Sequence, residues 1–425
     1  MVIGKGSETE HLSEADVREV AREALADYDL RDKRVLLIVP DHTRTTPMPL
    51  FFRMLHEMIA PTANKFDVLI ALGTHPPEDD EKIGKLLGIR PEERAGRYRN
   101  VQIFNHQWDK PEMLREMGTI SADEMARLSN GLMRQPLVIR LNRMIFDYDQ
   151  LIVVGPTFPH EVVGFSGGNK YFFPGISGPD IIHQTHWLGA LVTNVAINGT
   201  KKTVVRDIIN RAAATIAIPK LCFSLVCTHE GLHGVYVGTP EEAWEAAADL
   251  SAKVHIVYMD RAFKSVLSIA PAMYDDLWVG AKCMYKLEPV VADGGEIIVY
   301  APHITEVSFT HGLLIDRIGY HTRDYFLRQM DKFGDVPRAI LAHSTHVKGI
   351  GTFENGVECP RINVILATGI PEERCRRINL GYRDPKTIDP AQWEGRENEG
   401  RLLVRNAGEM LFRLKPTNER QPIGM

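Results

Sequence analysis

The sequence predicts an α/β protein of two domains, each with a largely parallel sheet flanked by helices. Its 425 residues exceed what one ordinary hydrophobic core contains, which favours more than one domain. Short apolar runs rich in β-branched residues alternate with segments of helical periodicity, and this alternation is typical of parallel sheets covered on both faces. Polar or glycine-rich loops follow three of the apolar runs, at the positions where ligands bind to such sheets.

The first half of the chain repeats the order strand, polar loop, helix. The run VLLIV at residues 35–39 ends in Pro40 and a polar turn, and a helical segment follows it. The run FDVLIAL at residues 66–72 leads in the same way into a loop and a helix. The expected strands of this half are residues 35–39, 66–72, 151–154, 221–226 and 254–258, and the expected helices are residues 13–28, 48–59, 79–87, 180–192 and 240–252.

A change of character after residue 268 marks the expected domain boundary. Residues 269–398 contain apolar runs at 297–300, 339–342 and 363–367, which we expect to be strands, and a helical segment around 324–333. We therefore expect an N-terminal domain over residues 1–268 and a C-terminal domain over residues 269–398. The tail at residues 399–425 is helical or extended in this interpretation and packs back on the first domain.

The composition argues against several functional classes. The 50 basic and 55 acidic residues give a formal charge of −5 and are interleaved along the chain, which does not favour a nucleic-acid or membrane surface. The five cysteines form no C-x-x-C pair, so neither a disulfide framework nor a four-cysteine zinc site is expected. No apolar run reaches the ~18 residues of a membrane span, and no signal peptide is recognisable. A cytoplasmic enzyme is expected.

Polar side chains gather at the ends of the first two expected strands, in DHTR at residues 41–44 and GTH at residues 73–75. A histidine there can transfer protons because its ordinary pKa lies near neutrality. The planar guanidinium of Arg44 can grip a carboxylate. The residues alone leave a structural alternative open, in which the histidine bonds a backbone carbonyl and Arg44 pairs with Asp41.

The third loop carries His160 and the glycine-rich segment GFSGGNK at residues 164–170. Glycines there permit positive φ or a close approach of the backbone to a ligand. Lys170 ends this segment, so a bound phosphate or a covalent adduct would fit. The pattern G-x-x-x-x-G-K-[ST] of ATP-binding loops is absent, and a simple tight turn is the alternative.

Three further residues are candidate ligands. His183 and His186 are three positions apart on an expected helix and lie near one face, where they could hold a metal. Capping or surface histidines have the same spacing, so this alternative stays open. Lys282 is a candidate cation for binding a substrate, although lysines in such positions are usually only solvated.

Together these motifs resemble the nickel-pincer-dependent lactate racemase family. The shared features are DxTR at 41–44, GTH at 73–75, NH at 105–106 and H-x-x-x-GFSGGxK at 160–170, followed by PGI. The resemblance implies a two-domain α/β isomerase with its active site in the interdomain cleft, acting as a 2-hydroxy acid racemase or epimerase. It also implies a covalently bound nickel-pincer nucleotide, pyridinium-3-thioamide-5-thiocarboxylic acid mononucleotide.

The resemblance assigns roles to individual residues. Lys170 would form the thioamide link to the cofactor, and His186 would be the protein ligand of the nickel, which leaves His183 to support the nickel site from outside its ligands or to have a structural role. His75 and His160 would exchange the hydroxyl proton on the two sides of the substrate, while hydride leaves the 2-carbon and returns to the other face of a 2-oxo acid. Arg44 and Lys282 would hold the substrate carboxylate. The further residues expected to line the cofactor pocket are Asp41, Thr74, Ser166, Gly167 and Gly168.

The chain departs from the family near Lys282. Lactate racemases have a glutamine in a Y-Q-x-x-K pattern, where this sequence has Trp278 and Val279, so an amide contact to the substrate carboxylate is lost. Trp278 is expected to shape a pocket for a different side chain, which favours a 2-hydroxy acid other than lactate. The enzymes that build the cofactor are expected as transient partners.

Two other functions are compatible with these residues. A zinc or iron hydrolase would place His75, His160 and His186 around one metal, with Asp41 as the general base. A non-catalytic protein that binds or stores the pincer nucleotide would carry the adduct on Lys170 without turnover of a hydroxy acid.

Overall fold

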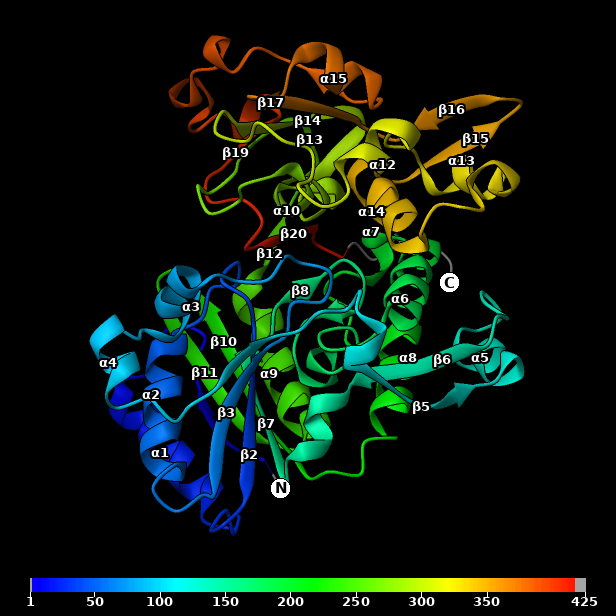
Figure 1. The fold of residues 1–425 in the computed structure, drawn as a ribbon. Coiled ribbons are helices and arrows are strands. Elements are labelled where there is room, and N and C mark those ends of the chain that lie inside the picture. Colours follow the sequence, from blue (N-terminus) through cyan, green and yellow to red (C-terminus); the bar gives the residue numbers. More distant parts are fainter. Residues whose placement is uncertain (1, 417–425) are drawn as a thin grey trace. The chain divides into compact units, whose positions relative to one another are not determined.

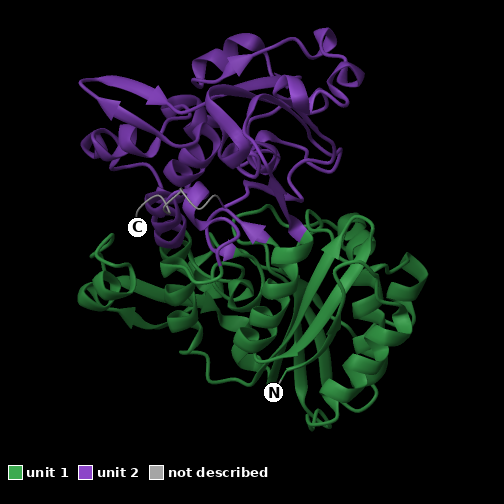
Figure 2. Ribbon diagram, turned by 180° about the vertical axis from the view of Figure 1, so that it is seen from behind, with its two compact units in different colours: residues 1–158, 165–182, 201–254 green, residues 159–164, 183–200, 255–425 purple. Residues whose placement is uncertain are grey.

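The computed structural model describes residues 2–416 and confirms the α/β class. The chain forms two compact units, which are coloured separately in Figure 2. Unit 1 comprises Met1–Phe158, Phe165–Ile182 and Lys201–Val254, and unit 2 comprises Pro159–Gly164, His183–Thr200 and His255–Met425. The chain therefore leaves unit 1 and returns to it twice before it enters unit 2 for the last time.

A seven-stranded sheet forms the centre of unit 1 (Figure 1), in the order β1-β11-β10-β7-β2-β3-β4. The pairs from β10 to β4 are parallel, whereas β11 is antiparallel to β1 and to β10. The strands are β1 (Ile3–Gly6), β2 (Arg34–Val39), β3 (Lys65–Ile70), β4 (Ile103–Asn105), β7 (Gln150–Pro156), β10 (Lys220–Thr228) and β11 (Gly231–Gly238). Because β2, β3, β4 and β7 are parallel, the loops that follow them leave from the same edge of the sheet.

Helices cover both faces of this sheet. On one face, α1 (Glu14–Leu25) and α2 (Met48–Ile59) share an apolar core with β2 and β3, in which Phe51 and Leu37 are fully buried. On the other face, Ala247 and Leu250 of α9 (Pro240–His255) pack with Val226 of β10. The other elements of this unit are α3 (Asp80–Leu87), α4 (Pro91–Ala95), α5 (Ala122–Leu128), α8 (Val204–Ala213) and the antiparallel pair β5 (Leu114–Ile120) and β6 (Leu137–Asn142); α6 (Pro179–Val192) begins in unit 1 and continues in unit 2.

A five-stranded sheet is the centre of unit 2, in the order β18-β17-β14-β13-β19, with every neighbouring pair parallel. Its strands are β13 (Phe263–Ile269), β14 (Val291–Ala301), β17 (Asn363–Thr368), β18 (Gly381–Tyr382) and β19 (Arg401–Val404). Three small pairs accompany it: β12 (Ile256–Met259) with β20 (Leu411–Leu414), β15 (Gly351–Glu354) with β16 (Val357–Pro360), and β8 (Pro159–His160) with β9 (Gly164–Phe165). The helices are α7 (Asn194–Ile197), α10 (Leu277–Gly280), α11 (Lys282–Tyr285), α12 (Gly312–Ile318), α13 (Arg323–Leu327), α14 (Arg338–Lys348) and α15 (Glu372–Arg377).

The strand expected at residues 339–342 is wrong, because these residues belong to α14. Residues 339–347 of this helix are all buried, so its apolar run reflects burial on every side of the helix. Periodicity does not separate a short buried strand from part of a buried helix. Pro337, which precedes the first turn, is compatible with a helix start and is the local signal that favoured this outcome.

The division into units differs from the expected domain boundary. The units are divided between residues 254 and 255, whereas the expected boundary after residue 268 falls at the end of β13. Two strands of the expected tail, β19 and β20, belong to unit 2, and β20 pairs with β12. Residues 417–425 of that tail lie outside the described residues. The domain assignment itself stays a prediction.

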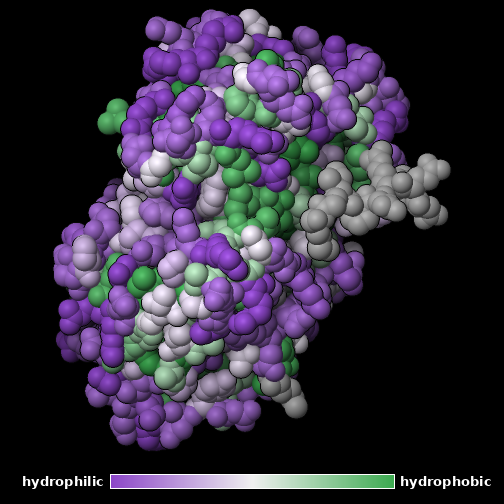
Figure 3. Space-filling view, turned by 90° about the vertical axis from the view of Figure 1, so that its right-hand side faces the viewer, coloured by the Kyte–Doolittle hydropathy of each residue, from purple (hydrophilic) through white to green (hydrophobic). Residues whose placement is uncertain are grey.

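The surface is mainly polar. Figure 3 shows hydrophilic residues over most of the visible face. Leu313 and Phe309 are the most exposed of the large apolar side chains in the described part, at 89% and 66%. Within residues 2–416, no helix combines the length and apolar character needed to span a membrane.

Candidate functional site

The loops after β2 and β3 lie at the carboxyl edge of the unit 1 sheet and bring Asp41 to His75. The imidazole Nδ1 of His75 lies 3.2 Å from Oδ2 of Asp41. Asp41 is buried, whereas the side chain of His75 keeps 23% of its exposure. Thr74 lies beside His75 in the same loop and is partly exposed. A buried carboxylate that holds one imidazole nitrogen orients the ring and leaves the other nitrogen for chemistry.

Asp41 also organises its own loop. One carboxylate oxygen accepts hydrogen bonds from the backbone N–H and the hydroxyl of Thr43, and Nη1 of Arg44 donates to that hydroxyl over 3.0 Å. Burial alone would raise the pKa of Asp41, but the charges of Arg44 and His75 and the hydrogen bonds from His75 and Thr43 hold this pKa well below its usual range. Asp41 is therefore an anion at neutral pH.

The NH motif at Asn105 and His106 has a structural role in this fold. His106 is 1% exposed, with Nε2 3.0 Å from the carbonyl of Ser177 and Nδ1 3.1 Å from the amide nitrogen of Asn142. Burial lowers the pKa of His106 to about 4. The ring is therefore neutral, donates from Nε2 to Ser177 and accepts at Nδ1 from Asn142, which ties β4 to β6 and to the start of α6.

Two buried side chains hold the glycine-rich loop of unit 1 from behind. Arg206 of α8 donates to the carbonyls of Phe165 and Gly167, and the indole nitrogen of Trp244 in α9 donates to the carbonyl of Ser166 over 2.8 Å. The guanidinium carbon of Arg206 also lies 4.2 Å from the centre of the Trp244 ring. Three successive carbonyls are thus fixed just before Lys170.

The two glycines of this loop are required by geometry. Gly167 and Gly168 have φ of 84° and 59°. A Cβ at Gly167 would lie 2.4 Å from the hydroxyl of Thr157, and one at Gly168 would lie 2.8 Å from the carbonyl of Pro240. The expected cofactor residue Ser166 uses its hydroxyl inside the protein, donating to the carbonyl of Pro156 and accepting from the N–H of Phe158.

Lys170 lies in a 3-10 helix at Gly168–Tyr171, close to the loops that carry Asp41 and His75. The carbonyl of Lys170 accepts from the N–H of Gly175, and the carbonyl of Gly175 accepts from the N–H of Gly73 at the start of the GTH loop. Tyr171 is partly buried near Arg44 and Asp41, and desolvation raises its pKa well above the ordinary value. The lysine segment, DxTR and GTH therefore share one edge of the unit 1 sheet.

His160 of unit 2 is buried and has two neighbours on one nitrogen. Its Nδ1 accepts from the N–H of Val162 over 3.1 Å and lies 3.2 Å from Oε2 of Glu161. The first contact suits a neutral ring with its proton on Nε2, and the second suits an imidazolium that donates to Glu161.

Unit 2 also contains a group of aromatic rings around the expected residues His186 and Trp278. The ring of Trp278 stacks on His343 at 3.7 Å and lies 4.7 Å from His311. Burial, and next the charges of His346, His311 and His186, lower the pKa of His343 well below its ordinary value. His186 is thus near His343, and the imidazoles of His343 and His311 hold the ring of Trp278 in place.

Lys282 lies at the start of α11, with Nζ 4.9 Å from the centre of the Tyr274 ring. A cation over an aromatic face is favoured by the ring quadrupole.

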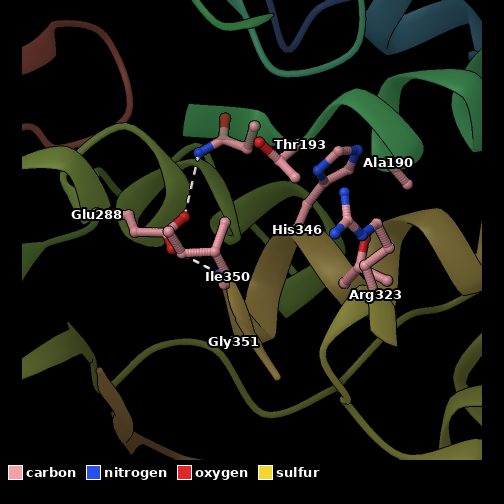
Figure 4. Close-up of a pocket in the computed structure, with 10 residues that line it drawn as sticks. Ala190, Thr193, Glu288, Arg323, His346, Ile350 and Gly351 are labelled. Carbon is pink, nitrogen blue, oxygen red and sulfur yellow. Dashed lines mark hydrogen bonds between the residues drawn. The ribbon is translucent and has the colours of Figure 1, made fainter. Parts of the chain in front are cut away.

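A pocket of unit 2, with an empty volume of about 330 Å³ that includes open solvent, was not expected from the sequence. Figure 4 shows His346, Arg323 and Glu288 among its lining residues, which come from α14, α13 and the segment before β14. Burial lowers the pKa of His346 to about 4, so this imidazole is neutral. The pocket also contains Ala190 of α6, one helical turn after His186.

The structure gathers the expected residues in two sets. Asp41, Arg44, Thr74, His75, Ser166–Gly168 and Lys170 belong to unit 1, and His160, His186, Trp278 and Lys282 belong to unit 2. In the part of the chain that the structure describes, no three His, Cys, Asp or Glu side chains are grouped to hold a metal ion.

Sequence reasoning missed Arg206 and Trp244, although Arg206 left a signal. Arg206, Ile209 and Ala213 recur at helical spacing, and all three are buried. An arginine in an apolar stripe needs internal hydrogen-bond partners. Trp244 and His343 carry no comparable local signal.

The sequence that carries these loops is similar to that of known proteins. A family model described as the lactate racemase N-terminal domain matches residues 4–198, which include DxTR, GTH and the glycine-rich lysine loop. A protein named lactate racemase from Thermoanaerobacterium thermosaccharolyticum is 25% identical over 310 residues, covering 70% of this chain and 67% of that protein. Another from Lactiplantibacillus plantarum is 23% identical over 290 residues, covering 67% and 60%.

Solved structures show the same fold. A protein from Thermotoga maritima superposes with a TM-score of 0.89 at 32% identity, covering 97% of this chain and all of that one. The lactate racemase apoprotein from T. thermosaccharolyticum gives a TM-score of 0.70 at 18% identity, covering 97% and 94%. The class is thus an α/β protein with a lactate racemase N-terminal domain. Residues 4–198 match the lactate racemase N-terminal domain family, the chain is similar to proteins named lactate racemase, and the isomerase class of these relatives agrees with the expected enzyme.

Proposed function

We propose that this protein is a racemase or epimerase that inverts the 2-carbon of a 2-hydroxy acid by reversible hydride transfer, using a nickel-pincer nucleotide attached to Lys170. The observation that carries the proposal is the fixed glycine-rich loop that ends in Lys170, next to the DxTR and GTH loops. Gly167 and Gly168 leave no room for a Cβ, and three carbonyls of the loop are held by Arg206 and Trp244. Such a loop can support a covalently attached group in one orientation.

The residues of unit 1 fit a charged nucleotide. Lys170 would hold it through its side-chain nitrogen, while Asp41, Thr74 and the segment Ser166–Gly168 would line its pocket. When bound, this cofactor would accept the hydrogen of the 2-carbon as hydride and return it. No carbanion beside a carboxylate is then needed. His75, oriented by Asp41, takes or gives the hydroxyl proton, and Arg44 binds the substrate carboxylate.

The expected residues of unit 2 complete the proposal. His186 would ligate nickel, and sulfur with imidazole is a suitable ligand set for this metal. His160 would exchange the hydroxyl proton on the other side of the substrate, and its Nδ1 is held by the N–H of Val162. Lys282 would bind the substrate carboxylate.

The substrate proposed is a 2-hydroxy acid other than, or in addition to, lactate. Trp278 is fixed by its stack on His343, so it would form a rigid wall rather than an amide donor. The cofactor-building enzymes are the proposed transient partners. A cytoplasmic location is proposed from the cysteine pattern, and none of the five cysteines forms a disulfide.

The test is the mass of Lys170 in protein produced together with the cofactor-building enzymes. We expect an adduct on the peptide that contains Lys170, and turnover of single enantiomers of 2-hydroxy acids. Lys170→Arg should keep the fold and lose both, and Lys220→Arg serves as a control lysine of the same unit. Racemisation by a protein with an unmodified Lys170 would defeat the proposal, and an adduct without any turnover would indicate a cofactor-binding protein.

A further inference from the structure

Two histidine–carboxylate pairs link the loops after β2 and β3 in a reciprocal way. Asp41 of the first loop pairs with His75 of the second, at 3.2 Å. His42 of the first loop pairs with Glu78 of the second, with Nδ1 2.6 Å from Oε1. Each loop therefore provides one carboxylate and one imidazole, and both pairs belong to unit 1.

The two pairs have the same chemical arrangement. In both, the carboxylate faces Nδ1 and is buried, with side-chain exposures of 5% for Asp41 and 2% for Glu78. In both, the ring is open to solvent, with 23% exposure for His75 and 33% for His42. The described residues give Nε2 of His42 no hydrogen-bond partner. A carboxylate on Nδ1 fixes the tautomer that presents Nε2 for proton transfer.

A purely structural latch does not account for Glu78. The side chain of Asn105 already holds this loop, because it accepts from the N–H of Glu78 and donates to its carbonyl over 3.0 and 2.8 Å. The Oε1 atom of Glu78 is used by the ring and the N–H of His42, whereas Oε2 is buried without a partner among the described residues. Burial of a half-satisfied carboxylate is costly, and such groups in native proteins commonly have a functional reason.

The groups around His42 act on its pKa in both directions. The hydrogen bond to Glu78 raises the pKa of His42, burial opposes this, and the charges of Glu78 and Asp41 raise it further, while Lys82 lowers it.

We propose that His42, oriented by Glu78, is an additional proton-transfer group of the active site beside His75. The inference rests on the proposed racemase function. In a turnover in which His42 rather than His75 takes the proton, the O–H bond of the substrate breaks, its proton goes to Nε2 of neutral His42, its electron pair forms the carbonyl, and the 2-hydrogen leaves as hydride to the proposed cofactor. In the return direction the imidazolium gives the same proton back to oxygen. The Nδ1 proton stays on His42 and is donated to the carboxylate of Glu78 throughout, so the pair is regenerated.

The first experiment needs no cofactor. In the full-length protein, the pKa of His42 is measured by NMR titration in the wild type and in Glu78→Gln. We expect the pKa to fall when the carboxylate is replaced by an amide. His321 and Glu358 of unit 2 form a pair of similar geometry at 2.8 Å, so Glu358→Gln is the matched control and should leave the titration of His42 unchanged. An unchanged pKa of His42 in Glu78→Gln would overturn the role of Glu78.

The second experiment uses enzyme loaded with cofactor. We expect His42→Gln to lower kcat by roughly 100-fold with KM changed by less than about threefold, because the lost effect is proton transfer. Glu78→Gln should lower kcat less and move the pH–rate profile toward lower pH, and added imidazole should partly restore His42→Ala. Glu358→Gln should stay within about twofold of the wild type.

The outcomes separate this inference from the proposed function. If the loaded wild type turns over a 2-hydroxy acid while His42→Gln keeps its kcat and pH profile, His42 has no role in proton transfer and the inference fails alone. A loss in His42→Gln confined to KM would also overturn it, because it would indicate an anion-binding cation instead. If the loaded wild type turns over no 2-hydroxy acid at all, the proposed function fails first.

Discussion

At the scale of single residues, burial and partners decide the charge of each histidine. His106 follows β4 and His42 lies in the loop after β2 of the same sheet. His106 is 1% exposed and burial lowers its pKa to about 4, whereas the hydrogen bond to Glu78 raises the pKa of His42. The first is a neutral hydrogen-bonding link and the second is a group that can change charge. Two histidines at strand ends of one sheet therefore have different roles.

The lowered pKa of His106 predicts a pH dependence of stability. In the unfolded chain an ordinary histidine takes up a proton below about pH 6.5, whereas folded His106 does so only near pH 4, so the unfolded state binds more protons between these values. The contribution of neutral His106 to the free energy of unfolding is fully present above about pH 6.5. It falls by roughly 3 kcal/mol as the pH decreases toward 4. The free energy of unfolding in urea at pH 7.5, 5.5 and 4.5 measures it, with His106→Asn for comparison. A difference between the two proteins that does not shrink as the pH falls would contradict the prediction.

Residue types at the strand ends were predictable from the sequence, because DxTR, GTH and the glycine-lysine loop are contiguous motifs. Their partners were not. Glu78 and Trp244 are ordinary residues in their local context, and only the fold shows that they bond His42 and the Ser166 carbonyl. A hydrogen bond between distant positions has no periodic signature in one sequence.

At the scale of elements, α8 and α9 act together on the glycine-rich loop. Arg206 and Trp244 come from these two helices, and the loop lies against both. Burial lowers the pKa of Arg206 to about 9, so it is still a cation at neutral pH and its hydrogen bonds are charge-assisted. The loop that presents Lys170 is thus fixed by helices outside the strand that leads into it.

Removal of Arg206 tests this role. Arg206→Met would leave the carbonyls of Phe165 and Gly167 without their donors, and we expect a loss of roughly 2–4 kcal/mol in the free energy of unfolding. Arg206→Lys should lose less, because it keeps the charge but not the two-pronged geometry. The matched control is Arg211→Met on the same helix, whose pair with Glu124 is more exposed and should contribute less than about 1 kcal/mol. Equal effects of the two methionine variants would contradict the prediction.

The order of strands and helices around the DxTR and GTH loops was also predictable, since β2 and β3 are each followed by a change to helical spacing. The failure at α14 has a physical cause. Its residues 339–347 are buried on all sides, so the helix has no polar face from which a period of 3.6 residues could be recognised. Full burial, not weak helix propensity, removed the signal.

At the scale of the whole molecule, the chain path explains why the units could not be predicted from a linear boundary. Residues 183–200 lie between two segments of unit 1 but belong to unit 2. There the amide of Asn194 donates to the carbonyl of Tyr285 over 2.7 Å, and Arg323 donates to the carbonyl of Leu191 over 2.8 Å. Tertiary contacts assign residues 183–200 to unit 2, and a change of composition along the chain does not reveal such contacts.

The same path predicts that residues 255–425 are an incomplete folding unit. A fragment of these residues loses the partners of Tyr285 and Arg323 and the carbonyl of Asn198, to which Arg413 donates. We expect that this fragment unfolds without a cooperative transition, and that fusion of residues 183–200 to it through a flexible linker restores cooperativity and adds roughly 3–5 kcal/mol, from buried hydrogen bonds and apolar contacts together. Thermal and urea unfolding followed by circular dichroism measure both proteins, and the same fusion with Asn194→Ala should recover less. Equal cooperativity of the fragment with and without residues 183–200 would show that these residues are not needed for unit 2 to fold.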